Sequence, residues 1–98
     1  MSMTIVVTRN VSHRIRGFLA STMIELAPGT YTAPKMSPTV RERVWTVINE
    51  WAILDAESSI VMVWKDPTMP GGQNVRIFGT PPLELVEIDG LLVSRKTD

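Results

Sequence analysis

The sequence predicts one α+β domain in which two helices cover one face of an antiparallel sheet. The chain has 98 residues, enough for a single small core. Short runs rich in β-branched residues alternate with two stretches of helical apolar spacing. Proline–glycine and serine–proline pairs stand between these stretches, where a chain turns or a helix begins.

The first part of the chain predicts a strand, a helix and a strand. Met3–Thr8 has the composition of a strand covered on both faces. Asn10 and Ser12 offer helix N-caps. The helix should continue to Pro28-Gly29, because one apolar stripe persists up to that point. The stripe consists of Ile15, Phe18, Leu19, Thr22 or Met23, and Leu26. Thr30–Thr32 then predicts a short second strand.

The second part predicts a helix and a hairpin. Ser37-Pro38 places a cap and a proline at the start of a helix. Its apolar face consists of Val40, Val44, Val47, Ile48, Trp51 and Leu54. Ile60–Trp64 predicts a core strand, and Asn74–Phe78 alternates as its hairpin partner should. The order is βαβ followed by αββ, which predicts two helices on one face of an antiparallel sheet. The fold we expect is a ferredoxin-like βαββαβ sandwich with an extra C-terminal strand segment.

The C-terminal segment has a strand pattern and no helix, unlike the two parts before it. Pro81-Pro82 bars a helix, Leu83–Ile88 alternates apolar and polar residues, and Asp89-Gly90 offers a tight turn before Leu91–Val93. We therefore divide the chain into a core, 1–82, and a strand segment, 83–98. The segment can close its own sheet, or it can add to the sheet edge of another subunit.

Composition excludes several classes of site. Cysteine is absent, which rules out disulfides, thiolate ligands and a cysteine nucleophile. The N-terminal residues show no signal-peptide pattern and no stretch is apolar enough for a membrane span, so we expect a cytoplasmic protein without a membrane partner.

The net charge is zero, but the charged residues are unevenly distributed along the chain. Residues 1–43 hold six basic and two acidic side chains, and residues 44–98 hold four basic and eight acidic ones. The first half therefore favours an anionic partner, although a mixed solvated surface also explains it.

The segment Arg9–Gly17 is the richest local feature, with three arginines and one histidine but no acid. It lies at a strand end and a helix start, where backbone N–H groups favour phosphate. Arg14 and Arg16 straddle Ile15, which should face the core, so both can point outward. The helix dipole opposes each of them by about 0.3–1 kcal/mol. The segment predicts contacts to a phosphate backbone, and ordinary solvated arginines remain the alternative.

Catalytic and metal sites have little support. His13 is the single histidine and no serine–histidine–acid spacing accompanies it, so we expect a surface or capping residue. The carboxylates near predicted strand ends are Asp66, Glu84, Glu87 and Asp89. Turn chemistry explains Asp66 and Asp89, since each precedes a proline or glycine.

Three tryptophans offer faces on which bases can stack. Trp51 and Trp64 fall on core positions, so packing explains both. Trp45 lies off the helical stripe and is expected to be exposed or at an interface.

The chain resembles the small CRISPR-associated adaptation protein, the Cas-two family, in its type I-E branch. The resemblance is collinear over nearly the whole chain and depends on order and spacing, not on one motif. It is carried by Met1–Val11, Arg14–Ala20, Pro28–Tyr31, Arg41–Trp45, Ile60–Trp64, Phe78-Gly79 and Ile88–Leu91.

The resemblance implies a ferredoxin-like fold, a homodimer, and assembly with the larger integrase subunit, the Cas-one family. That complex captures double-stranded DNA and inserts it as a spacer, with the small subunit bracing the duplex. Together with the basic segment, it predicts DNA contacts at Asn10, Arg14, Arg16, Arg41 and Arg43. It also predicts partner contacts at Leu85, Val86, Ile88, Asp89, Leu91 and Val93.

Two departures bear on function. Family members described as metal-dependent endonucleases carry an aspartate at the end of the first strand. The type I-E branch tends to have an acid one position later, and this chain has Arg9 there. The branch can place paired arginines after the Phe-Gly pair, where this chain has Thr80-Pro81-Pro82. Part of the DNA contact could therefore be made by Arg41, Arg43 or Arg76 instead. We expect a structural subunit without catalytic residues, metal ligands or a cofactor. The alternatives are a magnesium-dependent endonuclease and a small ligand-binding domain.

Overall fold

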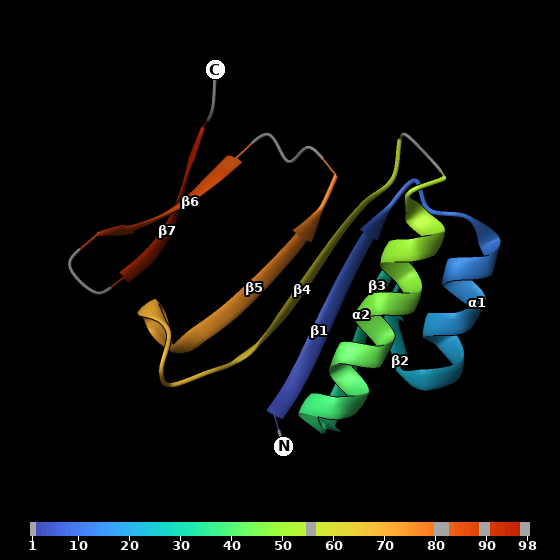
Figure 1. The fold of residues 1–98 in the computed structure, drawn as a ribbon, viewed down its shortest axis with the longest axis horizontal. Coiled ribbons are helices and arrows are strands. Elements are labelled where there is room, and N and C mark those ends of the chain that lie inside the picture. The colour runs from blue at the N-terminus through green and yellow to red at the C-terminus, as the bar shows by residue number, and fades with distance from the viewer. Residues whose placement is uncertain (1, 55–56, 80–82, 89–90, 97–98) are drawn as a thin grey trace.

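The computed structural model of the chain describes residues 2–54, 57–79, 83–88 and 91–96, and for the last two ranges it describes the backbone. A five-stranded antiparallel sheet has the order β2-β3-β1-β4-β5 (Figure 1). Its strands are β1 (Ser2–Arg9), β2 (Ile24–Ala27), β3 (Thr30–Met36), β4 (Ser59–Lys65) and β5 (Gln73–Phe78). The helices are α1 (His13–Thr22) and α2 (Pro38–Ala52). This confirms the predicted ferredoxin-like class, with β5 added beside β4.

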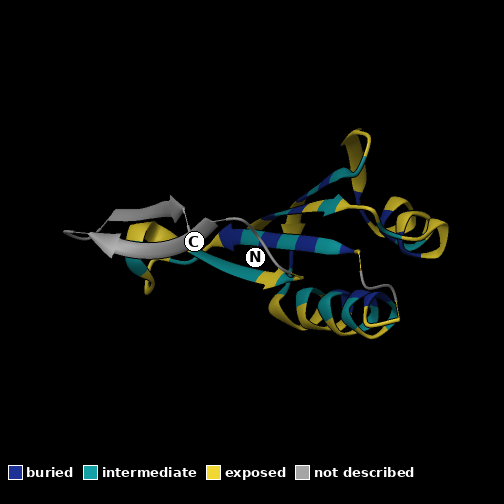
Figure 2. Ribbon diagram, turned by 90° about the horizontal axis from the view of Figure 1, so that it is seen from above, coloured by how far each residue is buried: buried dark blue, intermediate teal, exposed yellow. Residues whose placement is uncertain are grey.

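Strand β1 lies at the centre of the sheet and organises the core. Val6 pairs with Tyr31 of β3 on one side and with Met62 of β4 on the other, and all three side chains are fully buried. Ile15 and Leu19 of α1 and Ile48 of α2 complete the same cluster. Buried residues accordingly concentrate on the central strands and the inward sides of the helices (Figure 2).

Both helices begin with the predicted serine caps. The Ser12 hydroxyl accepts a hydrogen bond from the Ile15 backbone N–H at 3.3 Å, and Ser37 accepts one from Val40 at 3.2 Å. Each cap satisfies one backbone donor that the first helical turn leaves unpaired. Arg14 and Arg16 point away from fully buried Ile15, as predicted, and both are exposed.

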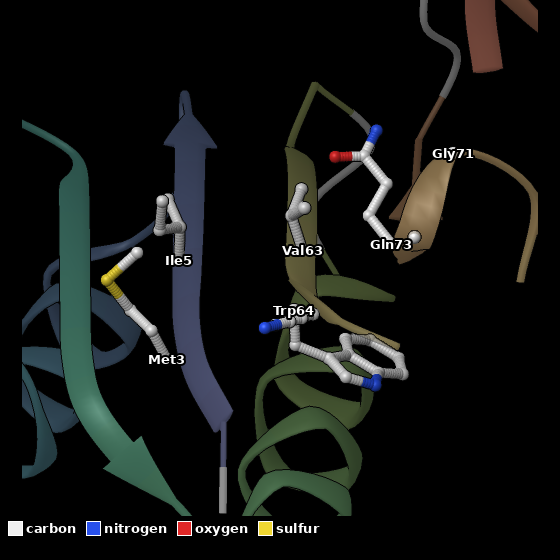
Figure 3. Close-up of a pocket in the computed structure, with 8 residues that line it drawn as sticks. Met3, Ile5, Val63, Trp64, Gly71 and Gln73 are labelled. Carbon is white, nitrogen blue, oxygen red and sulfur yellow. The ribbon is translucent and has the colours of Figure 1, made fainter. Parts of the chain in front are cut away.

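The opposite face of the sheet is apolar and carries neither α1 nor α2. Met3 and Val7 of β1 and Ile77 of β5 are 53%, 42% and 37% exposed on it. Between them, Ile5 pairs with Val63 across β1 and β4. A shallow groove of about 300 Å³ runs there between β1, β4 and the start of β5 (Figure 3).

The C-terminal segment forms two strands, as one of the predicted alternatives had it. β6 (Leu83–Ile88) and β7 (Leu91–Lys96) pair antiparallel as a separate two-stranded sheet (Figure 1). The predicted turn at Asp89-Gly90 and the linker at 80–82 lie outside the described residues. Whether this segment docks on another subunit stays a prediction.

The predicted length of the first helix is wrong. α1 ends at Thr22, and Met23 adopts an extended conformation that leads into β2. The hydroxyls of Ser21 and Thr22 both bond back to the Phe18 carbonyl, which competes with continued helix. Leu26 is therefore 65% exposed on a strand instead of buried on a helical stripe. Pro28-Gly29 turns the β2–β3 hairpin and does not end a helix.

Other predictions fail at the ends of the α2 stripe. Leu54 lies beyond the last helical residue and is 85% exposed, and Val40, in the first turn, is 44% exposed. Trp45 is half-buried against the core cluster and not fully exposed, and its predicted place at an interface stays a prediction. β3 also runs to Met36, well past the predicted Thr32, because Ala33 and Met36 are buried with the core.

We expect Gly29→Ala to lower the free energy of unfolding by about 1–3 kcal/mol. Gly29 has φ +80°, and a Cβ there would lie 2.9 Å from the Thr8 carbonyl oxygen. Gly17 in α1 has no atom within 4 Å of its added Cβ, so Gly17→Ala should raise stability by about 0.5–1 kcal/mol. Urea unfolding of both variants measures the difference, and equal effects would contradict the assignment.

Candidate nucleic-acid interface

The end of β1 is fixed to the β2–β3 turn by two hydrogen bonds. The Thr8 backbone N–H and hydroxyl donate to the Gly29 carbonyl at 2.7 and 3.0 Å. The chain then turns through Asn10, which has φ +56°, a left-handed conformation that asparagine tolerates. Ser58 donates its hydroxyl to the Asn10 carbonyl at 3.1 Å and anchors the turn to the start of β4. These contacts set where the basic segment begins.

A hollow of about 380 Å³ opens beside this turn and gathers two arginines. It is lined by Thr8, Arg9, Asn10, Val11, Arg16, Pro28 and Gly29. Arg9 and Arg16 are exposed, and neither has an ion-pair partner within residues 2–54 and 57–79. A hollow with two free guanidinium groups and no carboxylate in its wall favours an anion. Asn10, predicted as a DNA contact, lines the same hollow.

Arg16 also borders a smaller hollow of about 240 Å³ that includes Glu25. Glu25 accepts a hydrogen bond from the Gly29 N–H at 3.3 Å, so its carboxylate helps hold the hairpin turn. The fully buried Tyr31 lies near both charged groups. Burial raises the pKa of its hydroxyl, Arg16 lowers that pKa, and Glu25 raises it. Tyr31 therefore stays neutral at physiological pH and leaves the charge of Arg16 unchanged.

Arg14 lies outside the hollow and stacks on an aromatic ring of the other helix. Its guanidinium carbon is 3.8 Å from the centroid of the Trp51 ring. Phe18 packs edge-on against the same ring, with centroids 5.5 Å apart and planes at 72°. The predicted core role of Trp51 therefore holds for only part of its surface, since the ring is half-buried. Arg14 and Trp51 are 37 positions apart, so no local sequence pattern indicates this contact.

Arg41 and Arg43 lie away from this edge, toward the other end of α2. Ten residues of helix separate Arg41 from Trp51, which is about 15 Å along the axis. Arg41 stacks on Trp64 at 4.2 Å, and its Nε is buried without a hydrogen-bond partner among the described groups. Arg43 is exposed. The five predicted DNA contacts therefore form two groups: Asn10, Arg14 and Arg16 near one end of α2, and Arg41 and Arg43 near the other.

Arg76 is engaged in an ion pair and is a poor substitute for the missing paired arginines. Its guanidinium binds both carboxylate oxygens of Glu42, and it lies 5.3 Å from the Trp64 ring. The hydrogen bond to Arg76 lowers the pKa of Glu42, and the same bond raises the pKa of Arg76. Its charge is thus balanced within the chain.

Asp66 has the turn role that the sequence predicted. It accepts hydrogen bonds from the Thr68 hydroxyl at 2.6 Å, the Thr68 N–H at 3.1 Å and the Asn74 side chain at 3.3 Å. The bonds from Thr68 hold the pKa of Asp66 below its ordinary value. Within the described residues, no group of three or more histidine and carboxylate side chains comes together as a metal site.

The predicted partner-binding residues are described only through the backbone. Register pairs Val86 with Val93 and Ile88 with Leu91 across β6 and β7, and Leu85 pairs with Ser94. Four of the six predicted residues therefore make two cross-strand pairs. The fifth, Leu85, belongs to a different pair, and Asp89 lies outside the described residues.

A comparison with protein families finds a match over nearly the whole chain. The family model described as CRISPR-associated protein (Cas_Cas2CT1978) matches residues 3–93. The chain belongs to this Cas2-type family. The match includes both arginine groups and most of the C-terminal hairpin of this Cas2-type protein. A role connected with CRISPR follows from it. None of the helices described in this family member is long and apolar enough to cross a membrane.

Proposed function

We propose that this protein is a DNA-binding structural subunit of a type I-E spacer-acquisition complex, bracing a captured duplex between integrase dimers. The observation that carries the proposal is the cluster of Arg9, Arg14 and Arg16 around the start of α1. These three exposed arginines have no carboxylate partner in the described part of the chain. Membership of the Cas2-type family supports a CRISPR role for this basic edge.

The chemistry of the cluster suits a phosphate backbone better than base edges. Phosphate contacts come from arginines, small polar side chains and backbone N–H groups, and they carry no sequence information. Arg9, Arg16 and Asn10 surround a hollow open to solvent, and Arg14 stacks on Trp51 outside it. A duplex should therefore be bound with little preference for sequence.

The proposed complex contains this chain as a homodimer joined through the open sheet face. That face exposes Met3, Val7 and Ile77 and half-buries Ile5 and Val63, with charged Arg9 and Lys65 at its two ends. A second copy offers the same apolar surface, which a two-fold axis makes self-complementary. The groove in Figure 3 gives room for side chains of the second copy.

The endonuclease alternative finds no support in the strand-end chemistry. A magnesium ion needs oxygen ligands, usually carboxylates. Thr8, Arg9 and Asn10 offer no carboxylate at the end of β1, and Arg9 repels a cation. Asp66 lies at the far end of β4 from Arg9 and already accepts hydrogen bonds from Thr68 and Asn74. Glu57, in the loop before β4, is a single exposed carboxylate.

We expect replacement of both Arg14 and Arg16 by alanine to weaken binding to mixed-sequence duplexes about equally. Each lost phosphate contact should remove roughly 0.9 from the slope of log affinity against log salt concentration. Lys35→Ala is the matched control, because Lys35 is an exposed basic residue on β3 outside the cluster. Fluorescence anisotropy at several salt concentrations measures this. A double variant with unchanged affinity and slope would refute the contact.

We expect light scattering to give twice the 10.9 kDa chain mass for the wild type and a monomer for Val63→Glu. The substitution places a charge in the middle of the open apolar face, where burial of an unpaired carboxylate is costly. Ile53→Glu is the control, since Ile53 is 68% exposed at the end of α2, away from that face. A wild-type monomer at high micromolar concentration would count against the dimer.

We expect truncation after Pro82 to abolish capture of the larger integrase subunit in a pull-down. The truncated chain keeps all five strands of the main sheet and both helices, so its circular dichroism should still show a folded domain. The proposal is strand addition by β6 and β7 to the partner. If the truncated chain captured the larger subunit as well as the full chain does, the hairpin would not be the docking segment.

A further inference from the structure

The Arg14–Trp51 stack joins the start of α1 to the last turn of α2. Figure 1 shows the two helices side by side, and the Phe18–Trp51 contact confirms that they touch at this level. Trp51 is the second-last residue of α2 and Arg14 the second residue of α1. The guanidinium group therefore lies near the carbonyl end of α2, whose partial negative charge favours a cation. This location offsets the repulsion that Arg14 meets at the start of its own helix.

Stacking fixes the guanidinium without using its hydrogen-bond donors. The guanidinium carbon of Arg14 lies 3.8 Å from the centroid of the indole ring. An arginine stacked on an aromatic face keeps its N–H donors free for other partners. Within residues 2–54 and 57–79, Arg14 makes no hydrogen bond or ion pair. Its donors are thus available to a phosphate while its side chain is already ordered.

The second stack in the molecule has a different character. Arg41 lies over Trp64, but that ring is only 5% exposed and also faces Arg76, which Glu42 binds. Arg41 Nε is itself buried. The Arg14–Trp51 pair instead combines an exposed arginine with a half-buried ring.

We propose that Trp51 is a positioning residue that holds the Arg14 guanidinium ready for a duplex phosphate, an inference that rests on the proposed DNA-binding function. A free arginine loses side-chain conformational freedom when it binds, and prior ordering removes part of that loss. Trp51 itself need not touch DNA. Its contribution passes through Arg14 and disappears when Arg14 is absent.

The test is a double-mutant cycle with Arg14→Ala, Trp51→Leu and the combined variant, using a mixed-sequence DNA duplex at several salt concentrations. Trp51→Leu should weaken binding about two- to five-fold, the range of an exposed cation–π contact, and leave the salt slope unchanged because Arg14 still reaches the phosphate. Arg14→Ala should lower the slope by roughly 0.9. The combined variant should bind as Arg14→Ala does.

Two companion variants separate positioning from folding. Trp51→Phe keeps an aromatic ring against Phe18 and should give an intermediate affinity, since phenylalanine is a weaker cation–π partner. Trp45→Leu is the matched control, because Trp45 is also half-buried on α2 and no described guanidinium stacks on it; its affinity should match the wild type. In the free protein, the Arg14 Nε–H resonance should show a ring-current shift that Trp51→Leu removes.

Three results would overturn the inference: an unchanged affinity of Trp51→Leu, an equal loss from Trp51→Leu with and without Arg14, or an equal loss from Trp45→Leu. The first two leave the DNA-binding proposal intact if Arg14→Ala still changes the slope. An unchanged slope in Arg14→Ala would instead refute the phosphate contact itself, and the positioning role with it.

Discussion

The two hydrogen bonds from Thr8 to the Gly29 carbonyl hold together the part of the molecule on which its proposed function depends. They bring the β2–β3 turn against the end of β1, so that Arg9, Asn10 and Arg16 surround one hollow with Gly29. The approach is so close that no side chain fits at Gly29, whose φ of +80° also suits glycine alone. Ser58 anchors the following turn through Asn10. Backbone contacts therefore determine where Arg9 and Arg16 leave the main chain.

Charge is distributed so that one edge of the chain remains uncompensated. Arg76, the arginine of β5, is neutralised by Glu42, and Asp66 is satisfied by its own turn. Arg9, Arg14 and Arg16 lack such partners in the described residues. Aromatic rings contact two arginines that lack a carboxylate partner in the described residues: Trp51 contacts Arg14 at this edge, and Trp64 contacts Arg41 toward the other end of α2. A ring orders an arginine while keeping its full positive charge, which suits binding to an anion.

Local chemistry predicted the parts of the fold that short-range patterns determine. The Ser37-Pro38 cap, the buried face around Val44 and Ile48, and the β4–β5 hairpin all follow from neighbouring residues. β2 could not be found this way, because Met23 and Leu26 continue the helical spacing of Ile15 and Leu19. The strand is decided by pairing with β3, which is a tertiary contact.

In the candidate site, too, local sequence predicts some features and tertiary packing determines the others. Exposure of Arg14 and Arg16 around Ile15 follows from helical periodicity. The Arg14–Trp51 stack and the Glu42–Arg76 pair join residues more than thirty positions apart, and only the packing of the elements reveals them. Arg41 and Arg43 carry the charge that the sequence suggested, but the length of α2 separates them from the first group.

We propose above all that this Cas2-type protein binds the phosphate backbone of a DNA duplex and does not cleave the DNA. The most direct measurement incubates the purified protein with end-labelled duplex in magnesium or manganese, and follows the bound fraction on native gels and the strand length on denaturing gels. The account predicts salt-sensitive binding of full-length strands. Robust cleavage that persists through repeated purification and is lost in Asp66→Asn or Asp89→Asn would contradict it.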